Sequence, residues 1–340
     1  MNYSTTEIVD KDIWEQLIAS FPESNFLQSY NWGSFHFALG KRVLRIVVSD
    51  GTRYVAIVSG VIEVAKRGTY LAIAGGPLLD WTNASLVGYV FAELKERAKA
   101  EGCQFIRFRP QEVDSAELRQ LVSANGAVEA PMHLTADLTL QLNLTLGEEE
   151  LLGQMRKNTR STIRKAVRDG YTVEQSSELS DMEQFCKLQE ELAARQQFVP
   201  FSREFLTEQF KAFSPDGQVM LFHSYTPEHV SLASAFVLFY NQEAVYHYGV
   251  STLENHSQPG SYVCQWYAIQ EAKRRGCLRY NFWGIAPKNE AEHRFAGVSL
   301  FKRGFGGEEV AYLPAHDIPL SAVYGATKLF ELARKKLRRL

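Results

Sequence analysis

One lysine in the sequence occupies a position where its charge needs an explanation. The stretch SLFKRGFGGEEVAYLP, residues 299–314, places Lys302 directly after Phe301 and ahead of a glycine-rich turn that contains Phe305. Holding an ammonium group beside apolar rings costs free energy unless a counter-charge or an anionic ligand compensates for it. We therefore expect Lys302 to meet such a group. The alternative is a lysine that extends from a helix end into water, beside glycines that only make a turn.

A second concentration of charge lies in MRKNTRSTIRKAVRDG, residues 155–170, which has a local excess of five positive charges. Four of its basic residues are spaced by three or four positions, so a helix would place them on one face. These residues, which we call the basic stripe, are Lys157, Arg160, Arg164 and Arg168. Such a stripe can dock the phosphate backbone of a nucleic acid. The alternative is a solvated helix face with one buried edge.

The elements that position these residues recur in the two halves of the sequence. AKAEGCQFIRF, which starts at Ala98, and AKRRGCLRYNF, which starts at Ala272, share the pattern A-K-x-x-G-C at an offset of 174 residues. The same offset aligns the strand-like runs TYLAIAGG and EAVYHYGV without a gap and places Gly75 opposite Gly249. The agreement indicates an internal duplication.

Each half has apolar strand-like runs, then an amphipathic helix that glycine ends, then a buried strand. In the first half these segments are 42–50, 53–65, 69–76, 84–102 and 103–109, and in the second they are 218–226, 231–241, 243–251, 261–276 and 277–284. Antiparallel strands that lead into a helix and a further strand predict two mixed α/β (α+β) domains of one type.

Composition limits the function. The chain has 340 residues, of which 45% are hydrophobic, so it can bury a substantial core. Its net charge of −2 argues against a general polyanion binder, and any nucleic-acid contact must come from a local patch. The four cysteines lack CxxC spacing and the eight histidines are dispersed, so we expect no disulfide framework, no metal site and no cofactor.

The two ends of the sequence indicate where in the cell the protein is found. The N-terminal MNYSTTEIVDKDIWEQL is acidic and lacks the apolar region of a signal peptide, and no apolar run is long enough to span a membrane, so we expect a cytoplasmic protein. The C-terminal GATKLFELARKKLRRL, residues 325–340, predicts an amphipathic helix with many basic residues. This helix could rest on anionic lipid at the inner membrane face. The alternative is a terminal helix packed on the first domain with its charges in water.

Five segments taken together resemble a known family. FLQSYNWGSF, KNTRSTIRKAVRDG, YHYGVS with the following PGSYVCQWYAIQEAKRRG, YNFWGI and FKRGFGGE resemble, in order and spacing, the FemABX peptidoglycan-bridge peptidyltransferases from about residue 26 to residue 315. The resemblance implies two tandem GNAT-like acyltransferase domains with mixed sheets. The first would cover residues 1–140 and be joined by residues 313–340, and the second would cover residues 141–312. No segment between residues 170 and 300 suits the long helical hairpin of many members, so a compact, arm-less member is expected.

The resemblance also implies an activity and its partners. Family members transfer an amino acid from aminoacyl-tRNA to the free amine of a peptidoglycan stem-peptide precursor, which is lipid-linked or nucleotide-linked. Phe301 and Lys302 match the pair at the transfer site, where the lysine would stabilise the oxyanion of the tetrahedral intermediate or hold the tRNA terminus and acceptor in line. The basic stripe would then bind the tRNA.

Two further residues, Tyr248 and His36, match positions that line the acceptor pocket. Tyr248 belongs to a Y-H-Y strand pattern in which Tyr246 shares its side and His247 faces the opposite side. Its hydroxyl would point toward the precursor, and the alternative is an ordinary core tyrosine. His36 stands where a compact relative has a basic residue, although a lone histidine is more often structural.

The sequence departs from the family pattern at several positions. Arg109 stands where a compact relative has an acidic residue, and Asn281 stands where aspartate is common. Phe201 and Phe205 stand where arginine and tyrosine contact the diphosphate-sugar part of the acceptor. Losing these charge-assisted bonds would weaken binding of a nucleotide-linked precursor. We therefore expect the lipid-linked precursor to be preferred.

Two rival functions remain open. An acyl-CoA-dependent GNAT N-acetyltransferase would need a Q/R-x-x-G-x-G/A loop between a strand and a helix, whose amides bind the pyrophosphate. The nearest candidate, Arg303 to Glu308, ends in glutamate and leads into a strand-like run. A non-catalytic protein that binds tRNA or the cell wall is the other rival, because the basic stripe alone could support it.

Overall fold

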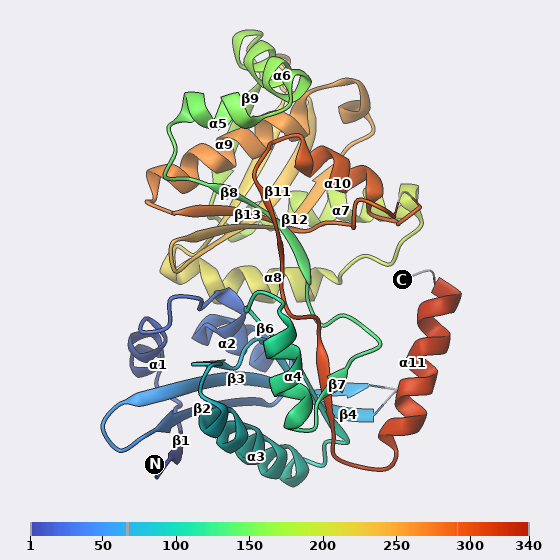
Figure 1. The fold of residues 1–340 in the computed structure, drawn as a ribbon. Helices are drawn as coiled ribbons and strands as arrows, with labels where there is room; N and C mark the ends of the chain where they lie inside the picture. The colour runs from blue at the N-terminus through green and yellow to red at the C-terminus, as the bar shows by residue number, and fades with distance from the viewer. Residues whose placement is uncertain (1, 66–67, 291, 339–340) are drawn as a thin grey trace. The chain divides into compact units, whose positions relative to one another are not determined.

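The structure is a computed structural model that describes residues 2–65, 68–290 and 292–338. The chain divides into two compact units (Figure 1). Unit 1 comprises residues 1–138, 291–294 and 310–340, and unit 2 comprises residues 139–290 and 295–309. None of the described helices is both long and apolar enough to cross a membrane.

Unit 1 is built on an eight-stranded mixed sheet in the order β1-β2-β3-β4-β6-β15-β7, with β5 paired to β3. Its strands are β1 (Ser4–Glu7), β2 (Val43–Ser49), β3 (Tyr54–Ala65), β4 (Gly68–Gly75), β5 (Leu78–Leu79), β6 (Phe105–Pro110), β7 (Val128–Glu129) and β15 (His316–Pro319). Its helices are α1 (Lys11–Ile18), α2 (Tyr30–Ala38), α3 (Ala84–Ala100), α4 (Ala116–Ala124) and α11 (Tyr324–Arg338), with the 3₁₀ turn η1 (Phe26–Gln28). The β4–β6 pair is parallel, whereas β2–β3 and β3–β4 are antiparallel.

The core of unit 1 forms where α3 packs on this sheet. Apolar residues three or four positions apart in α3 form its buried face: Leu86, Val87, Val90, Phe91, Leu94 and Ala98. They join strand residues such as Ile46 and Ile106 in one hydrophobic cluster. Asn83 caps the helix by accepting a hydrogen bond from the Leu86 amide, which satisfies a donor that the first turn leaves unpaired.

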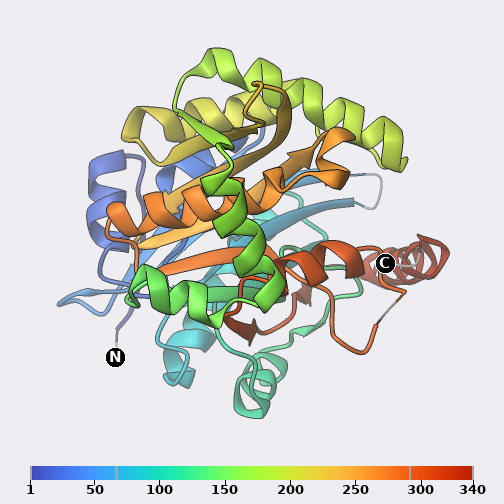
Figure 2. The same ribbon diagram turned by 90° about the horizontal axis from the view of Figure 1, so that it is seen from above.

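Unit 2 is built on a seven-stranded mixed sheet in the order β14-β8-β13-β12-β11-β10-β9. Its strands are β8 (Leu138–Asn143), β9 (Thr172–Ser176), β10 (Val219–Tyr225), β11 (Ser231–Tyr240), β12 (Glu243–Ser251), β13 (Arg279–Gly284) and β14 (Glu308–Ala311). Its helices are α5 (Glu148–Gln154), α6 (Lys157–Arg168), α7 (Met182–Gln196), α8 (Arg203–Phe213), α9 (Gly260–Arg274) and α10 (Ala296–Arg303), with the turns η2 (Leu179–Asp181), η3 (Ser214–Asp216) and η4 (Glu254–Ser257). Figure 2 shows α9 on one face of this sheet and α7 on the other.

The two units repeat one arrangement, as the internal sequence match predicts. In each, three antiparallel strands lead through a long helix to a strand that pairs in parallel with the third. Strands β6 and β13 begin at Phe105 and Arg279, which are 174 residues apart, the same offset as in the sequence. Gly102 and Gly276 end the preceding helices with φ of 70° and 77°, a left-handed conformation that favours glycine. The expected mixed α/β fold class is therefore confirmed.

The C-terminal helix α11 packs on unit 1 through polar groups. Arg107 of β6 makes two hydrogen bonds of 2.7 Å to Asp317 of β15 and one of 2.7 Å to Glu331 of α11, and all three side chains are buried. The Tyr324 hydroxyl also donates to Asp317 at 3.0 Å. Residues 339–340 of the predicted helix lie outside the described residues.

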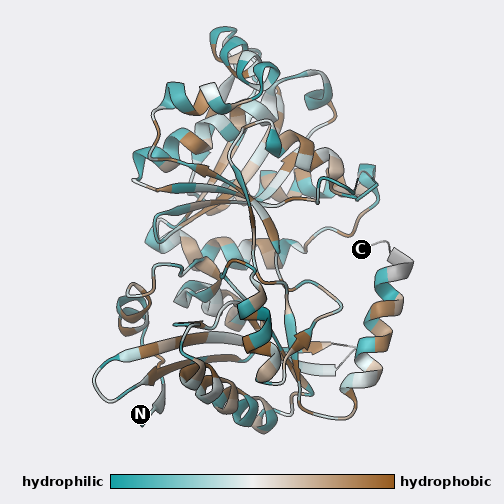
Figure 3. Cartoon of the chain, viewed as in Figure 1, coloured by the Kyte–Doolittle hydropathy of each residue, from teal (hydrophilic) through white to brown (hydrophobic). Residues whose placement is uncertain are grey.

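Helix α11 carries both hydrophilic and hydrophobic residues along its length (Figure 3). Leu329, Phe330 and Leu332 are exposed, whereas Thr327 and Glu331 are buried. The side of the described helix that packs inward is therefore polar, and the apolar residues on which the expected lipid contact depends are exposed. The reason is the buried Arg107, whose charge is compensated by placing Glu331 inward.

Candidate functional site

The sheet of unit 2 opens between two of its central strands. Strands β12 and β13 pair in parallel only from Glu243 to Val245 of β12, although β12 continues to Ser251. On the other side of β12 the register with β11 shifts, because Val237 lies opposite Tyr246 and Phe236 opposite Tyr248. His247 is thus an extra residue in a β-bulge, a feature that often adjoins active sites. The bulge at His247 thus lies just beyond Val245, the last residue of β12 that pairs with β13.

A strained residue stands on the opposite side of this opening. Trp283 of β13 has φ of 63°, a left-handed conformation that is costly for a bulky side chain. Its amide donates 2.8 Å to Oδ1 of the buried Asn281, whose Nδ2 donates 3.0 Å to Glu243. The Trp283 ring centroid lies 5.7 Å from that of His247. Asn281 thus holds the backbone that aims Trp283 toward the bulge.

Lys302 reaches this opening from α10. Its side chain is only 8% exposed, and Nζ donates a 2.7 Å hydrogen bond to the carbonyl of Gly284 at the end of β13. Nζ also lies 5.7 Å from the ring centroid of Tyr246 on β12. The alternative of a lysine that extends into water does not describe this residue.

Burial governs the charge of Lys302. Desolvation lowers the pKa of its ammonium group to about 8. Within residues 2–65, 68–290 and 292–338, no carboxylate lies within ion-pairing distance of Nζ, whereas the neighbouring Arg303 pairs with Glu309 at 2.6 Å. Lys302 therefore holds an uncompensated positive charge at the opening, which suits an anionic group of a ligand or transition state.

The glycine-rich turn after Lys302 is required for packing. A Cβ on Gly304 would lie 2.6 Å from Oγ1 of Thr159, and one on Gly306 would lie 2.8 Å from the carbonyl of Gln154. Gly306 and Gly307 both have φ of 84°, and the turn leads into β14. The glycines let the turn approach α5, α6 and β8, and the turn does not precede a helix as a pyrophosphate-binding loop would.

An aromatic cluster brings three predicted residues together. The rings of Phe201 and Phe205 are stacked with centroids 5.0 Å apart, and Phe201 lies 5.0 Å from Tyr248 of β12. The Tyr248 hydroxyl donates 3.0 Å to Oε1 of Gln209 on α8. Burial raises the pKa of Tyr248 above its usual range, so the phenol stays neutral and keeps its proton. Tyr248 is half-buried and Phe201 is 48% exposed, so this cluster forms an apolar surface that a ligand can reach.

Two other predicted residues belong to unit 1. His36 of α2 is buried against Trp32 and Phe35 with ring centroids 4.8 and 4.5 Å away. Burial, with a smaller effect of Lys41, lowers the pKa of His36 to about 3, so the ring is neutral and cannot supply the positive charge of a basic residue. Arg109 is also fully buried, and its guanidinium donates to Oε1 of Gln111 at 2.6 Å and to the Ala136 carbonyl. These described contacts are internal to unit 1.

The basic stripe lies on α6 and is largely exposed. Thr159, Ile163 and Ala166 form the buried edge of the helix, which contacts α9. Lys157, Arg164 and Arg168 are exposed.

Three members of the stripe have partners, and one of these is Arg168, which pairs with the adjacent Asp169 at 3.4 Å. Arg160 is half-buried and donates 3.2 Å to the carbonyl of Gly153 at the end of α5, and Arg164 pairs with Glu149 at 2.5 Å. At the first turn of α6, the amide of Arg156 donates 3.0 Å to the carbonyl of Gly304, so the stripe starts beside the turn that follows Lys302.

Comparison with known proteins identifies the family. A model of the FemAB family matches residues 11–225 and 218–331. The chain belongs to the FemAB family. The aminoacyltransferase FemA of Staphylococcus aureus (strain MW2) is 35% identical to it over 100 residues, which are 28% of this chain and 24% of FemA. The match thus spans about a quarter of that relative's length.

Solved structures show the fold of this FemAB-family chain. The crystal structure of FemX has a TM-score of 0.85 at 18% identity and covers 97% of this chain and 100% of FemX. A tandem GNAT protein from the clavulanic acid biosynthesis pathway has a TM-score of 0.59 at 10% identity, with 94% and 99% covered. L-PGS from Bacillus licheniformis has a TM-score of 0.59 at 14% identity, with 95% and 96% covered. The expected tandem GNAT-like fold and the family resemblance are confirmed.

Some residues at the opening in this FemAB-family chain could not be predicted from sequence patterns. Strict alternation along Y-H-Y places Tyr246 with Tyr248 and His247 opposite, but the rings of His247 and Tyr248 lie 4.0 Å apart because the bulge interrupts the alternation. The positions of Trp283 and Gln209 in the site were also not predicted from the sequence. The only local signal for Trp283 is a bulky residue directly before Gly284 at the end of a predicted strand.

Proposed function

We propose that this chain is an aminoacyltransferase that moves an amino acid from aminoacyl-tRNA to the free amine of a peptidoglycan stem-peptide precursor, the step that forms an interpeptide bridge. Membership of the FemAB family and the similarity to the aminoacyltransferase FemA support this reaction class. The observation that carries the proposal is Lys302, a buried ammonium group at the opening between β12 and β13.

The reaction develops a negative charge that Lys302 could stabilise. The acceptor amine attacks the ester carbonyl carbon of the aminoacyl-tRNA, and the carbonyl oxygen becomes an oxyanion in the tetrahedral intermediate. When the intermediate collapses, the C–O bond to the terminal ribose breaks, the ribose oxygen takes a proton, and the amine nitrogen loses one. An ammonium group has three donors, and Gly284 occupies one of them in Lys302. The remaining donors can stabilise the oxyanion.

The surroundings of Lys302 suit the two substrates. Phe301 contacts Tyr262 with centroids 5.0 Å apart, which fixes the start of the turn at the transfer site. The exposed residues Lys157, Arg164 and Arg168 would bind the phosphates of the tRNA. The neutral hydroxyl of Tyr248 donates its single proton to Gln209, so it would accept a hydrogen bond from the precursor, beside the apolar surface of Phe201 and Phe205.

We further propose that the acceptor is the lipid-linked precursor and that the protein visits an anionic membrane surface. The Phe201 and Phe205 rings carry no charge to pair with a nucleotide diphosphate. The exposed Leu329, Phe330 and Leu332 of α11 stand beside basic residues such as Lys328 and Arg334, a combination that favours an anionic lipid surface.

His36 and Arg109 have internal contacts, so neither is proposed to bind the acceptor through its charge.

One experiment tests the reaction and separates it from its rivals. The purified chain is incubated with mixed aminoacyl-tRNAs and with lipid-linked and nucleotide-linked muropeptide precursors, and the products are analysed by mass spectrometry. The expected result is a precursor heavier by one aminoacyl residue, formed only with charged tRNA. Acetyl transfer from acetyl-CoA under the same conditions, or binding of charged tRNA without turnover, would contradict the proposal.

A further inference from the structure

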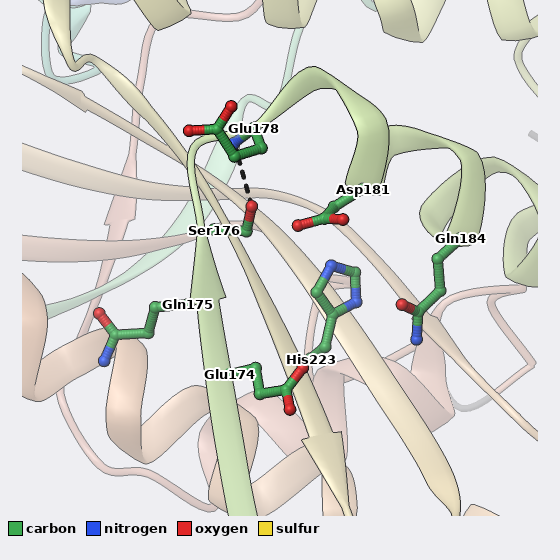
Figure 4. A pocket seen from close by; sticks show the side chains of 7 residues that line it. All are labelled: Glu174, Gln175, Ser176, Glu178, Asp181, Gln184 and His223. Carbon is green, nitrogen blue, oxygen red and sulfur yellow. Dashed lines mark hydrogen bonds between the residues drawn. The ribbon is translucent and has the colours of Figure 1, made fainter.

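A separate pocket lies at the β9 edge of the unit 2 sheet (Figure 4). Its volume is about 450 Å³, within the usual range for small-molecule sites. The residues that line it come from β9, η2, α7 and β10 and the link between β9 and η2: Glu174, Gln175, Ser176, Glu178, Asp181, Gln184 and His223. None of these residues has a part in the proposed aminoacyl transfer.

His223 directs an unsatisfied polar atom into this pocket. The side chain is 2% exposed, and Nδ1 lies 2.6 Å from the hydroxyl of Ser234. Nε2 is buried and has no hydrogen-bond partner among the residues that the structure describes. Figure 4 shows the ring projecting from β10 toward Asp181 and Gln184. A buried polar atom without a partner is costly, so a native structure that contains one has a reason to keep it.

Carboxylates line the pocket beside the ring. Glu174 lies directly opposite His223 in the antiparallel pairing of β9 with β10, so their side chains share a face of the sheet. Asp181 of η2 and Glu178 complete a group of three acidic residues. In the described part of the chain, no lysine or arginine forms an ion pair with any of the three.

The ring itself does not balance these charges. Burial lowers the pKa of His223, and the opposing effects of Asp181 and Glu174 do not reverse this shift. The neutral ring keeps one proton, and when this proton is on Nδ1 and is donated to Ser234, Nε2 is an acceptor. The pocket therefore presents three carboxylates and one buried acceptor, and it lacks a donor of matching charge.

We propose that this pocket binds a small organic cation with a primary ammonium group. The three donors of an ammonium group match Nε2 of His223 together with the carboxylates of Glu174 and Asp181. The Ser176 hydroxyl accepts from the Glu178 amide at 3.0 Å and can donate its own proton to a second polar group of the ligand. A metal ion is a poorer fit, because no group of three or more His, Cys, Asp or Glu residues in the described chain has the geometry to hold one.

Calorimetric titration of the full chain tests the site with four probes. The first is 1,5-diaminopentane, a free diamine, and the second is Nα-acetyl-lysine methylamide, which represents a lysine side chain in a peptide. The third is 1,5-pentanediol, a neutral control of the same length, and the fourth is magnesium chloride. We expect both amines to bind and the diol and magnesium not to bind. Tighter binding of the lysine derivative would indicate a peptide ligand, and tighter binding of the diamine a free polyamine.

A charge-removing variant identifies the pocket as the binding site. Glu174→Gln combined with Asp181→Asn keeps the shapes of the side chains and should weaken diamine binding at least about tenfold, because each carboxylate makes a charge-assisted bond to the ammonium group. Glu191→Gln is the matched control, since Glu191 is exposed on α7 outside the pocket lining. The NMR resonances of the His223 ring should also shift when the diamine is added and should not shift when the diol is added. Unchanged binding in the double variant, absence of diamine binding, or equal binding of magnesium would overturn the proposal.

Discussion

Lys302 donates its 2.7 Å hydrogen bond to Gly284, the residue at which β13 ends after leaving its partner β12. The bond joins α10 to the end of the strand that borders the opening, and it occupies one donor of a buried ammonium group. The acyl-transfer proposal rests on this relationship. It makes the side chain of Lys302 the first target for mutation.

Replacing Lys302 with methionine should reduce transfer far more than it reduces folding. Loss of one oxyanion donor typically costs about 2.7–4 kcal/mol in the barrier, or roughly 10²–10³ in kcat. Lys288→Met is the matched control, because Lys288 is 74% exposed in the same unit. The rate of amino-acid addition and the thermal midpoint should be measured for both variants. A folded Lys302→Met protein with full turnover would exclude the proposed role.

The lowered pKa of Lys302 gives a stability profile with a definite sign. Its pKa is about 8 in the folded chain and about 10.5 when exposed, so between these values the unfolded chain binds more protons. The free energy of unfolding should therefore rise with pH across this window, by a few kcal/mol at most. Below pH 8 Lys302 is protonated in both the folded and the unfolded chain, so its contribution to the free energy of unfolding does not change with pH. Denaturant titrations from pH 7 to 10.5 should show the rise in the native chain, and its persistence in Lys302→Met would show that another group causes it.

Reversing the exposed charges of the basic stripe should weaken the use of charged tRNA. The variant is Lys157→Glu with Arg168→Glu, which leaves Arg160 in place because it bonds to the end of α5. The salt dependence of the apparent tRNA affinity should become shallower by about 0.7–0.9 in log–log slope for each phosphate that is no longer neutralised. Arg42→Glu with Arg53→Glu, at exposed positions of unit 1, is the control. If both double variants retain the native slope, the stripe is a solvated helix face.

Removing Arg107 should destabilise unit 1. Arg107→Met would leave Asp317 and Glu331 buried without their cation, and breaking a buried pair in this way costs about 3–5 kcal/mol. The pair of Arg42 with Glu101, in which the Arg42 side chain is 73% exposed, provides the comparison, and Arg42→Met should change stability by less than about 1 kcal/mol. Thermal unfolding followed by calorimetry should show a large loss for the first variant only. Equal midpoints would mean that the buried network contributes little.

The membrane proposal is best tested by substitution within α11. Deleting the helix would remove Glu331 and confound the result, so Leu329→Ser with Phe330→Ser is preferred. This variant should bind less to vesicles that contain anionic lipid and should lose activity on the lipid-linked precursor alone. Vesicle flotation and parallel assays with both acceptors are the measurements. A native chain that prefers the nucleotide-linked precursor would contradict the acceptor assignment, and unchanged flotation of the variant would contradict the membrane contact.

The sequence by itself determined the repeated elements of the fold. Periodic apolar residues and the terminal Gly102 and Gly276 act within one helix or strand, so the offset of 174 residues could be found by inspection and reappears in β6 and β13. The lysine between Phe301 and the glycine-rich turn was equally visible, because a charge beside an aromatic ring and glycines is a local signal. These features depend on neighbours along the chain.

Only the tertiary structure decided what surrounds these residues. The break between β12 and β13, the bulge at His247 and the strained Trp283 arise from pairing between strands that are far apart in the sequence, which no local period specifies. For the same reason the sequence could not place Glu174 opposite His223, or show that Glu331 would turn inward to meet Arg107. Burial and charge compensation depend on partners from distant segments, and these partners become neighbours only when the chain has folded.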